Sequence, residues 1–238
     1  MGAVSSPEEL DRRATALAAA GGTGFLLSGG CDRRGRVPLG PYLGTVGRIR
    51  DRTGLGVNLH TGLVGEEEAI ALLASGADAF STDVVQDPRT IAGTLHLDAA
   101  PGDYRRTLEL LSPGGKLVPH VCVGLQSEQG EERTLDLISA IDIRAVIVLG
   151  LVPSKGTSLA SAPVDPGRVV RFIARAAEMV SAPIILGCMR SRSDRTIEIG
   201  AIEAGASGIV NPSAATVAWA RERGLRLEQE EVCCALHP

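Results

Sequence analysis

Apolar runs alternate with amphipathic segments along almost the whole chain of 238 residues. The apolar runs, most of them four to nine residues long, predict buried strands at 25–28, 54–60, 78–83, 116–125, 144–152, 183–188 and 208–211. Apolar positions at helical spacing predict helices at 7–20, 41–52, 65–76, 102–111, 131–140, 166–180, 196–204 and 214–223. Strands that alternate with helices predict successive βα units and a parallel sheet.

The residues at the ends of these strands favour a TIM-type (β/α) barrel over an open, doubly wound sheet. Each predicted strand ends in or beside a small, polar or charged residue: Ser28, His60, Asp83, Gly124, Pro153, Cys188 and Asn211. In a barrel these ends meet on one face and build one site, whereas in an open sheet they lie in a row. Seven strands are one fewer than eight, so the sequence predicts an incomplete barrel. It forms a single domain over residues 1–238, with residues 227–238 as a tail.

The missing strand predicts association with another chain. The predicted order begins with a helix, so the strand at Phe25 and the strand at Gly208 face each other across a gap. Unpaired N–H and C=O groups at such edges invite pairing with another chain. We therefore expect a partner subunit or a symmetric homodimer to fill the gap, with closure into a seven-stranded barrel as the alternative.

The composition of the chain indicates which binding partners and which cellular compartment to expect. The net charge is −4 and aromatic residues make up 3% of the chain, which argues against nucleic acid and anionic membranes as partners. The N-terminus lacks the basic and apolar regions of a signal peptide, and no apolar run is long enough to span a membrane. The sequence therefore predicts a cytoplasmic protein. Its five cysteines should be thiols or metal ligands rather than disulfides.

Several strand-end residues are candidates for chemistry. Asn58 and His60 could form hydrogen bonds with the hydroxyl groups of a ligand. A purely structural role for His60 is an almost equal alternative. Asp83 needs a cation, a hydroxyl or backbone donors beside it, because an unpaired buried carboxylate is costly. His120 lies within a strand and points either into the barrel or toward the helices. Asp83, Cys188 and Arg190 are the predicted catalytic residues.

The cysteines suggest a metal or an iron–sulfur cluster. Cys188 ends a strand beside Arg190, and a neighbouring cation favours a thiolate. The tail is expected to fold back over the mouth of the barrel and to bring Cys233 and Cys234 to Cys31 and Cys188. Thiolates are soft ligands, and they favour metal ions and iron–sulfur clusters of this kind. The alternative is a set of free thiols at the mouth, and Cys122 is expected to be a small core residue.

The order of these motifs resembles the radical S-adenosylmethionine (SAM) superfamily. The resemblance rests on five parts of the chain: Ser28-Gly29-Gly30-Cys31-Asp32, Val118-Pro119-His120-Val121 with Gly124-Leu125, the run from Val148 to Thr157, Leu186 to Arg190, and Cys233-Cys234. They look most like the biotin- and lipoyl-synthase branch. The resemblance implies SAM as cofactor and a small-molecule or carrier-protein-bound substrate. It implies cofactor-binding roles for Gly29, Gly30, Asn58, His60, His120, Gly124, Pro153, Lys155, Gly156 and Thr157.

One departure from the superfamily is central. Its members carry Cys-x-x-x-Cys-x-x-Cys after the first strand, and these thiolates hold a [4Fe–4S] cluster. The present chain has no such spacing. The resemblance therefore implies a subunit or fragment of a radical enzyme, in sulfur insertion or related cofactor biosynthesis, whose cluster motif is supplied elsewhere. The alternatives are a non-catalytic barrel subunit and an unrelated lyase- or aldolase-type barrel. An aldolase would need a strand-end lysine, which Lys116 and Lys155 do not provide.

Overall fold

The computed structural model describes residues 2–162, 165–192 and 196–236. Its strands are β1 (Gly24–Leu27), β2 (Gly56–His60), β3 (Ala79–Asp83), β4 (Leu117–Val123), β5 (Val146–Gly150), β6 (Ile184–Leu186) and β7 (Gly208–Ile209). Its α-helices are α1 (Pro7–Ala19), α2 (Gly40–Thr53), α3 (Glu66–Ala74), α4 (Pro101–Leu111), α5 (Glu128–Ser139), α6 (Pro166–Met179), α7 (Thr196–Glu203) and α8 (Ala214–Glu222). Three shorter helices are η1 (Thr90–Thr94), η2 (Ser112–Gly114) and η3 (Cys234–Leu236).

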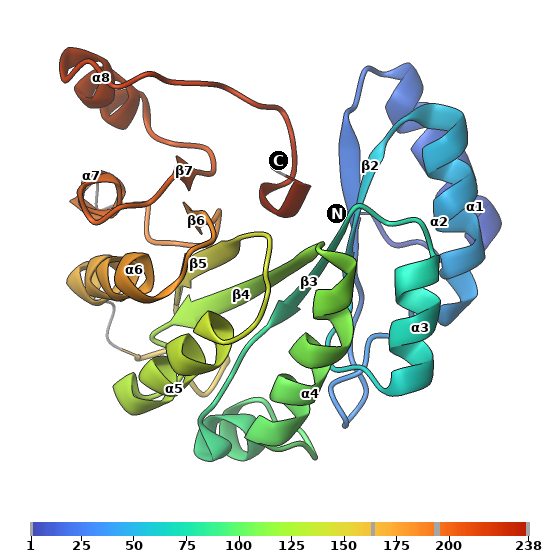
Figure 1. The fold of residues 1–238 in the computed structure, drawn as a ribbon, viewed down its shortest axis with the longest axis horizontal. Helices are drawn as coiled ribbons and strands as arrows, with labels where there is room; N and C mark the ends of the chain where they lie inside the picture. Colours follow the sequence, from blue (N-terminus) through green and yellow to red (C-terminus); the bar gives the residue numbers. More distant parts are fainter. Residues whose placement is uncertain (1, 163–164, 193–195, 237–238) are drawn as a thin grey trace.

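The seven strands form one parallel sheet in the order of the sequence, β1 to β7. The sheet curls into a half-barrel with helices along its convex side (Figure 1). Within the described residues β1 and β7 are the two edges and are not paired with each other. The predicted incomplete TIM-type barrel of seven strands is therefore confirmed. All the carboxyl ends of the strands lie at the same edge, as the alternation of elements indicated.

Local signals in the sequence explain where the helices begin and end. The Ser6 side chain caps α1 by accepting a hydrogen bond from the Glu9 amide, and Pro7 occupies the first turn. Gly54 ends α2 with a left-handed backbone (φ 70°), which glycine adopts without steric cost. Ser127 caps α5 in the same way as Ser6 caps α1. No helix of the described residues is both long enough and apolar enough to cross a membrane.

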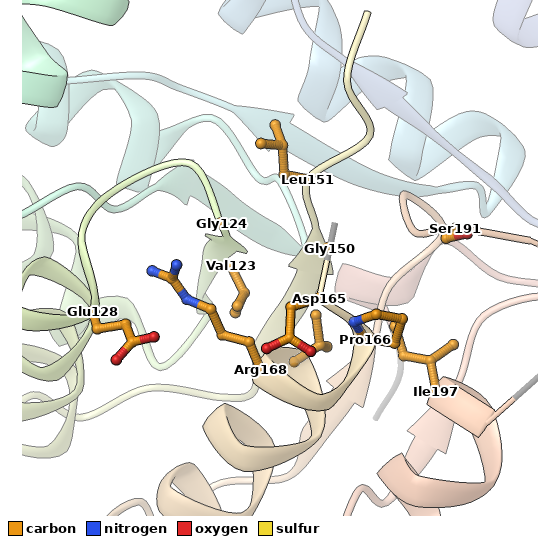
Figure 2. A pocket seen from close by; sticks show the side chains of 11 residues that line it. Val123, Gly124, Glu128, Gly150, Leu151, Asp165, Pro166, Arg168, Ser191 and Ile197 are labelled. Atoms are coloured by element: carbon orange, nitrogen blue, oxygen red, sulfur yellow. The ribbon is translucent and has the colours of Figure 1, made fainter. Parts of the chain in front are cut away.

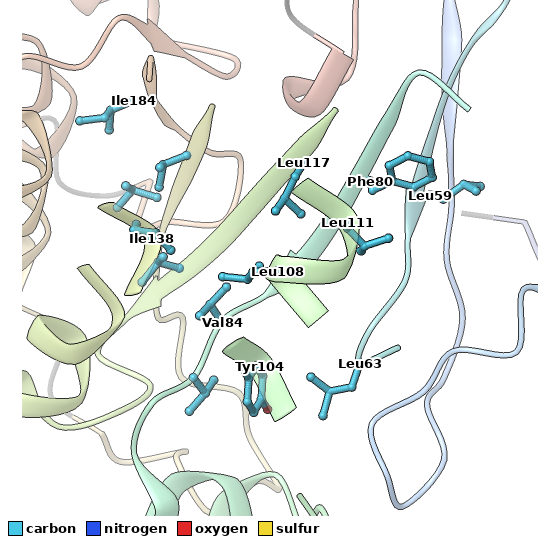
Figure 3. Close-up of a cluster of buried hydrophobic side chains, with 14 of the residues drawn as sticks. Leu59, Leu63, Phe80, Val84, Tyr104, Leu108, Leu111, Leu117, Ile138 and Ile184 are labelled. Atoms are coloured by element: carbon cyan, nitrogen blue, oxygen red, sulfur yellow. The ribbon is translucent and has the colours of Figure 1, made fainter. Parts of the chain in front are cut away.

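The main core lies between the sheet and the helices. Alternate strand residues point outward into it, among them Leu59, Phe80 and Leu117, and they pack with Leu108 and Leu111 of α4 (Figure 3). A smaller cluster lies on the concave side, with Ala79, Val118, Ile147 and Ile185. The two clusters lie on opposite faces of the strands because side chains alternate along a strand. The concave face therefore forms a lumen that is apolar at its floor, where the strands begin.

The C-terminal segment closes this floor. It returns from α8 across the open side of the half-barrel toward β2 (Figure 1), and the Thr23 hydroxyl donates to the Glu231 carbonyl on the way. Leu236 lies against Gly24 and Gly56, the first residues of β1 and β2. The expectation that the tail covers the mouth is wrong, because it packs at the opposite, amino-terminal end. Residues 237–238 of the predicted tail lie outside the described residues.

The fit of Leu236 can be tested with a glycine substitution. A Cβ atom at Gly56 would lie 3.1 Å from Leu236 Cδ1, so we expect Gly56→Ala to lower the free energy of unfolding by about 1–3 kcal/mol through overpacking. The double variant Gly56→Ala/Leu236→Ala should recover part of this loss. Urea denaturation measures both. If Gly56→Ala costs as much in the Leu236→Ala variant as in the unchanged protein, Leu236 does not fill this niche.

Candidate functional site

Polar side chains from three adjacent strands meet in the lumen above its apolar floor. Strand β2 contributes Asn58 and His60, β3 contributes Ser81 and Asp83, and β4 contributes His120. The parallel register pairs His60 with Ser81 and Asp83 with His120 across neighbouring strands. Four residues predicted from the sequence are therefore brought together, and the half-barrel has one polar site at this place.

Hydrogen bonds connect the residues of this cluster. The Ser81 hydroxyl donates to Asn58 Oδ1 at 3.0 Å and lies 3.3 Å from His60 Nδ1. His60 Nε2 lies 3.4 Å from Asp83 Oδ2. Since the only proton of Ser81 points to Asn58, Ser81 can interact with His60 only as an acceptor. The His60 ring therefore lies between the Ser81 hydroxyl and the Asp83 carboxyl group, and a proton on Nε2 would point to Asp83 Oδ2.

Asp83 is the member of the cluster that faces open space. Partial desolvation opposes its ionisation, but the hydrogen bond from His60 and the nearby His60 and His120 rings lower the pKa of its carboxyl group below the usual value. The side chain is 59% exposed. An ionised carboxylate at this position can accept hydrogen bonds or a proton from a ligand in the lumen.

His120 has the opposite character. Desolvation lowers the pKa of its ring to about 4, with the Asp83 carboxylate opposing this effect and His60 adding to it. Its ring centroid lies 5.5 Å from that of His60. Its Nε2 atom is buried and has no hydrogen-bond partner within the described part of the chain. A neutral imidazole with an unsatisfied nitrogen is a position where a ligand's polar group could be recognised.

The predicted glycine turn lies at the mouth. Gly29 and Gly30 follow β1, and a Cβ atom at Gly30 would meet no atom within 4 Å. The protein itself therefore does not require a glycine there. Asp32 accepts hydrogen bonds from the amides of Arg34 and Arg36 and closes the following turn. A Cβ atom at Gly29 would contact Val37 at 3.5 Å, so the open space lies beside Gly30, where the exposed main chain is accessible to a ligand.

The loop after β5 carries Pro153, Lys155, Gly156 and Thr157. The Thr157 hydroxyl donates to the Ser154 carbonyl at 2.7 Å, and Gly156 has a left-handed backbone (φ 84°). These contacts build an exposed turn, with Lys155, Gly156 and Thr157 all exposed. It lies beyond the end of β5, and within the described residues no hydrogen bond or ion pair joins it to the lumen residues.

A cavity of about 220 Å³ lies at the carboxyl ends of β4 and β5, beside the start of α6 (Figure 2). Gly124, Gly150, Asp165 and Arg168 line it. The Gly124 amide donates to Glu131 Oε1 at 2.7 Å, and Arg168 Nε donates to Glu131 Oε2 at 2.9 Å. The predicted residue Gly124 therefore belongs to this cavity, whose lining shares no residue with the histidine cluster.

Arg190 lies away from the lumen. Its guanidinium is fully buried (0% exposed) and donates to Glu198 Oε1 at 2.6 Å and to the Gly187 carbonyl. Cys188 is exposed, and its carbonyl accepts a hydrogen bond from Arg192. Although only one residue separates Cys188 from Arg190, the structure gives the arginine a connecting role between β6, α7 and the end of β7. The catalytic role predicted for Arg190 therefore has no geometric support.

The cysteines are spread over both ends of the half-barrel. Cys31 lies at the mouth, whereas Cys233 and Cys234 pack against the cluster at the floor. Asn58 Nδ2 donates to Cys233 Sγ at 3.6 Å. Within the described residues no three His, Cys, Asp or Glu side chains are placed to hold a metal ion. The structure therefore does not gather Cys31, Cys188, Cys233 and Cys234 into the predicted set. Cys122 is partly buried, and desolvation raises the pKa of its thiol to about 12. It lies on the same face of β4 as His120 and belongs to neither hydrophobic cluster, so the structure places it on the lumen face and not in the core.

Sequence reasoning missed Ser81 and the contact of Cys233 with Asn58. Ser81 alternates with Ala79 and Asp83 along β3, so its place on the face of Asp83 was available from the period of two. The Cys233 contact joins residues that are 175 positions apart. No local pattern indicates such a pairing.

No protein-family model and no curated protein matches this sequence. Solved structures match it in fold. HydG, a maturase of the [FeFe]-hydrogenase, aligns with a TM-score of 0.63 and 14% identity over 87% of this chain and 50% of that one. Methylornithine synthase (PylB) aligns with a TM-score of 0.65 and 14% identity over 93% of this chain and 73% of that one. The chain thus spans about half the length of HydG.

An aldolase barrel matches as well. Phospho-2-dehydro-3-deoxyheptonate aldolase from Thermotoga maritima aligns with a TM-score of 0.51 and 15% identity, over 87% of this chain and 56% of that one. HydG and PylB are radical SAM enzymes, so the chain shares the fold of that superfamily and of aldolase-type barrels. Identities of this size establish the fold alone.

Proposed function

We propose that this chain is the barrel part of a SAM-dependent radical enzyme whose cluster-binding segment lies in polypeptide outside residues 1–238. The proposal covers sulfur insertion or a related step of cofactor biosynthesis, in the cytoplasm, where the free thiols of this chain are typical. The observation that carries it is the combination of a half-barrel with an open side and a polar cluster in its lumen.

The open side supports a missing segment. Strands β1 and β7 are edges with no mutual pairing in the described chain, and the C-terminal segment crosses between them without joining the sheet as a strand. Exposed strand edges favour pairing with a further strand. Leu26 of β1 is 40% exposed on the lumen side, where an eighth strand would cover it. A partner subunit, a second copy or further residues of the same polypeptide can supply that strand.

The lumen supports a bound small molecule with both donors and acceptors. Asp83 offers an ionised carboxylate, His60 offers a proton at Nε2, and His120 offers a buried nitrogen without a partner. Gly29 and Gly30 are exposed at the same end of the barrel, with open space beside Gly30. The amino and carboxylate groups and ribose hydroxyls of SAM have matching chemistry, and a small or carrier-bound substrate would share the lumen.

The residues of this chain do not fit an iron–sulfur cluster. A [4Fe–4S] cluster is held by several cysteine thiolates, and the described residues contain no group of three ligands placed for a metal. We therefore assign the cluster ligands to other polypeptide. The role left to this chain is to bind and orient the ligand and to hold a proton on His60.

An acid–base enzyme of the lyase type is the second candidate. The observation in its favour is the pair of His60 and Asp83, with Ser81 fixing the ring of His60. A general acid and a general base are the least that proton transfer next to a carbonyl group requires, and a proton donor beside a carboxylate can provide both. In that case no iron-containing partner is needed.

Binding of SAM separates the two candidates. We expect equilibrium dialysis with labelled SAM to show binding to the chain isolated anaerobically from its native source with its partners. Asp83→Asn should weaken this binding by about tenfold, through loss of a charge-assisted hydrogen bond of about 1.5 kcal/mol. Asp136→Asn, on the exposed side of α5, is the matched control and should bind like the unchanged protein. Equal binding by both variants would contradict the lumen as the SAM site. An assembly that neither binds SAM nor contains iron would favour the second candidate.

A further inference from the structure

The floor of the lumen carries two adjacent thiols. Cys233 and Cys234 stand at the start of η3, and both pack against the inner cluster of Ala79, Val118 and Ile147. Both are free thiols of partly exposed residues. Two adjacent cysteines at the floor of the half-barrel form a pair of nucleophiles that the proposed function does not use.

The pair is connected to the polar cluster above it. Asn58 uses both ends of its amide, since Nδ2 donates to Cys233 Sγ and Oδ1 accepts from Ser81. Ser81 in turn contacts His60, which contacts Asp83. An unbroken series of contacts therefore runs from Cys233 to the His60–Asp83 pair, and a chemical change at Cys233 alters the acceptor of a fully buried amide.

The pair is also connected to the plug formed by Leu236. The Leu236 amide donates to the Cys233 carbonyl at 2.7 Å, and this turn holds Leu236 against Gly24 and Gly56. The Cα atoms of adjacent residues lie about 3.8 Å apart, which is closer than the 4.4–6.8 Å that disulfides usually span. A bond between the two sulfurs would therefore distort the backbone at this turn and would be readily reduced.

We propose that Cys233 and Cys234 form a reversible redox pair whose oxidation releases the Leu236 plug. The oxidant is a low-molecular-weight disulfide. One cysteine, as its thiolate, attacks a sulfur of that disulfide, and the first small thiolate leaves. The second cysteine then attacks the mixed disulfide, the sulfur–sulfur bond between Cys233 and Cys234 forms, and the second small thiolate leaves. The two cysteine protons end on the two released thiols, so two electrons pass from the pair to the oxidant.

The inference does not depend on SAM or on the cluster, and the test needs neither. The fully reduced chain is incubated with glutathione disulfide, acid-quenched and digested with trypsin, which releases residues 227–238 after Arg226. We expect this peptide to become lighter by two hydrogen atoms and to return to its original mass after treatment with excess reduced glutathione. Cys31→Ser is the matched control and should leave this change intact.

Single variants and hydrogen exchange complete the experiment. Cys233→Ser and Cys234→Ser should each stop at a glutathione adduct on the remaining thiol. Amide exchange in residues 227–238 should rise by about tenfold in the oxidised protein, because the turn at Leu236 is lost. Any of three results would overturn the proposal. They are a peptide with two glutathione adducts, a disulfide between this peptide and Cys188, and amide hydrogen exchange that is unchanged after oxidation.

Discussion

Replacing Glu198 by glutamine is expected to lower the free energy of unfolding by about 3–5 kcal/mol. Glu198 is 6% exposed and pairs at 2.6 Å with Arg190, whose side chain is 0% exposed. The substitution would leave the arginine charge buried without its counter-charge, and this is far more costly than losing a surface pair. Glu198 also accepts from the Ser213 amide and the Thr216 hydroxyl, so it joins α7 to the start of α8.

Denaturation by urea measures this loss, with Glu66→Gln as the control. Glu66 pairs with Arg106 on the surface, where the two side chains are 67% and 57% exposed, so its loss should cost no more than about 1 kcal/mol. Although burial opposes ionisation, the hydrogen bonds from Thr216, Arg190 and Ser213 lower the pKa of Glu198 to about 2. Its contribution is complete above pH 4.5 and fades as the pH falls toward 2. Equal losses in the two variants would contradict the buried pair.

Acidification from pH 7.5 to pH 4.5 is expected to cost about 2.5 kcal/mol of stability through His120 alone. Desolvation lowers the pKa of its ring from 6.5 to about 4 in the folded protein. The unfolded chain therefore takes up a proton below pH 6.5 that the folded chain refuses until about pH 4. Stability contributed by the neutral ring is complete above pH 6.5 and is lost as the pH falls.

The comparison of variants isolates this effect from other titrating groups. His120→Gln should flatten the dependence of unfolding free energy on pH over this range. His96→Gln, at an exposed position, should retain the slope of the unchanged protein. If the slope is the same in all three proteins, His120 is not held neutral by its surroundings and is a poor candidate for recognising a polar group.

The fold could be predicted because each element follows from a local pattern. Short apolar runs located the seven strands of the described residues, and the helical period of 3.6 residues located their eight longer helices. The ends are displaced by a few residues; for example, β2 begins at Gly56 rather than Gly54. The grouping of Asn58, His60 and Asp83 could be predicted because parallel strands deliver their ends to one edge, whereas the sequence left open which face of the sheet His120 occupies. That rule needs no knowledge of contacts between distant parts of the chain.

The remaining features depend on tertiary contacts that no local pattern indicates. The segment after α8 has no clear period, so nothing in it shows that it enters the floor rather than the mouth. Arg190 was assigned to Cys188 on proximity in sequence, whereas its side chain finds Glu198 of α7. The π-helix at Thr90–Thr94 was missed because its five residues are too few for a periodic signal.

The central claim is that this half-barrel supplies the ligand-binding lumen while other polypeptide supplies the cluster. The most direct measurement is formation of 5′-deoxyadenosine from SAM under reducing, anaerobic conditions, together with iron and sulfide content. We compare the chain alone, after reconstitution with iron and sulfide, with the assembly isolated through a tag on this chain from its native source. The account predicts a stoichiometric cluster and product from the assembly, and neither from the chain alone. A stoichiometric cluster and SAM cleavage in the chain alone would contradict it.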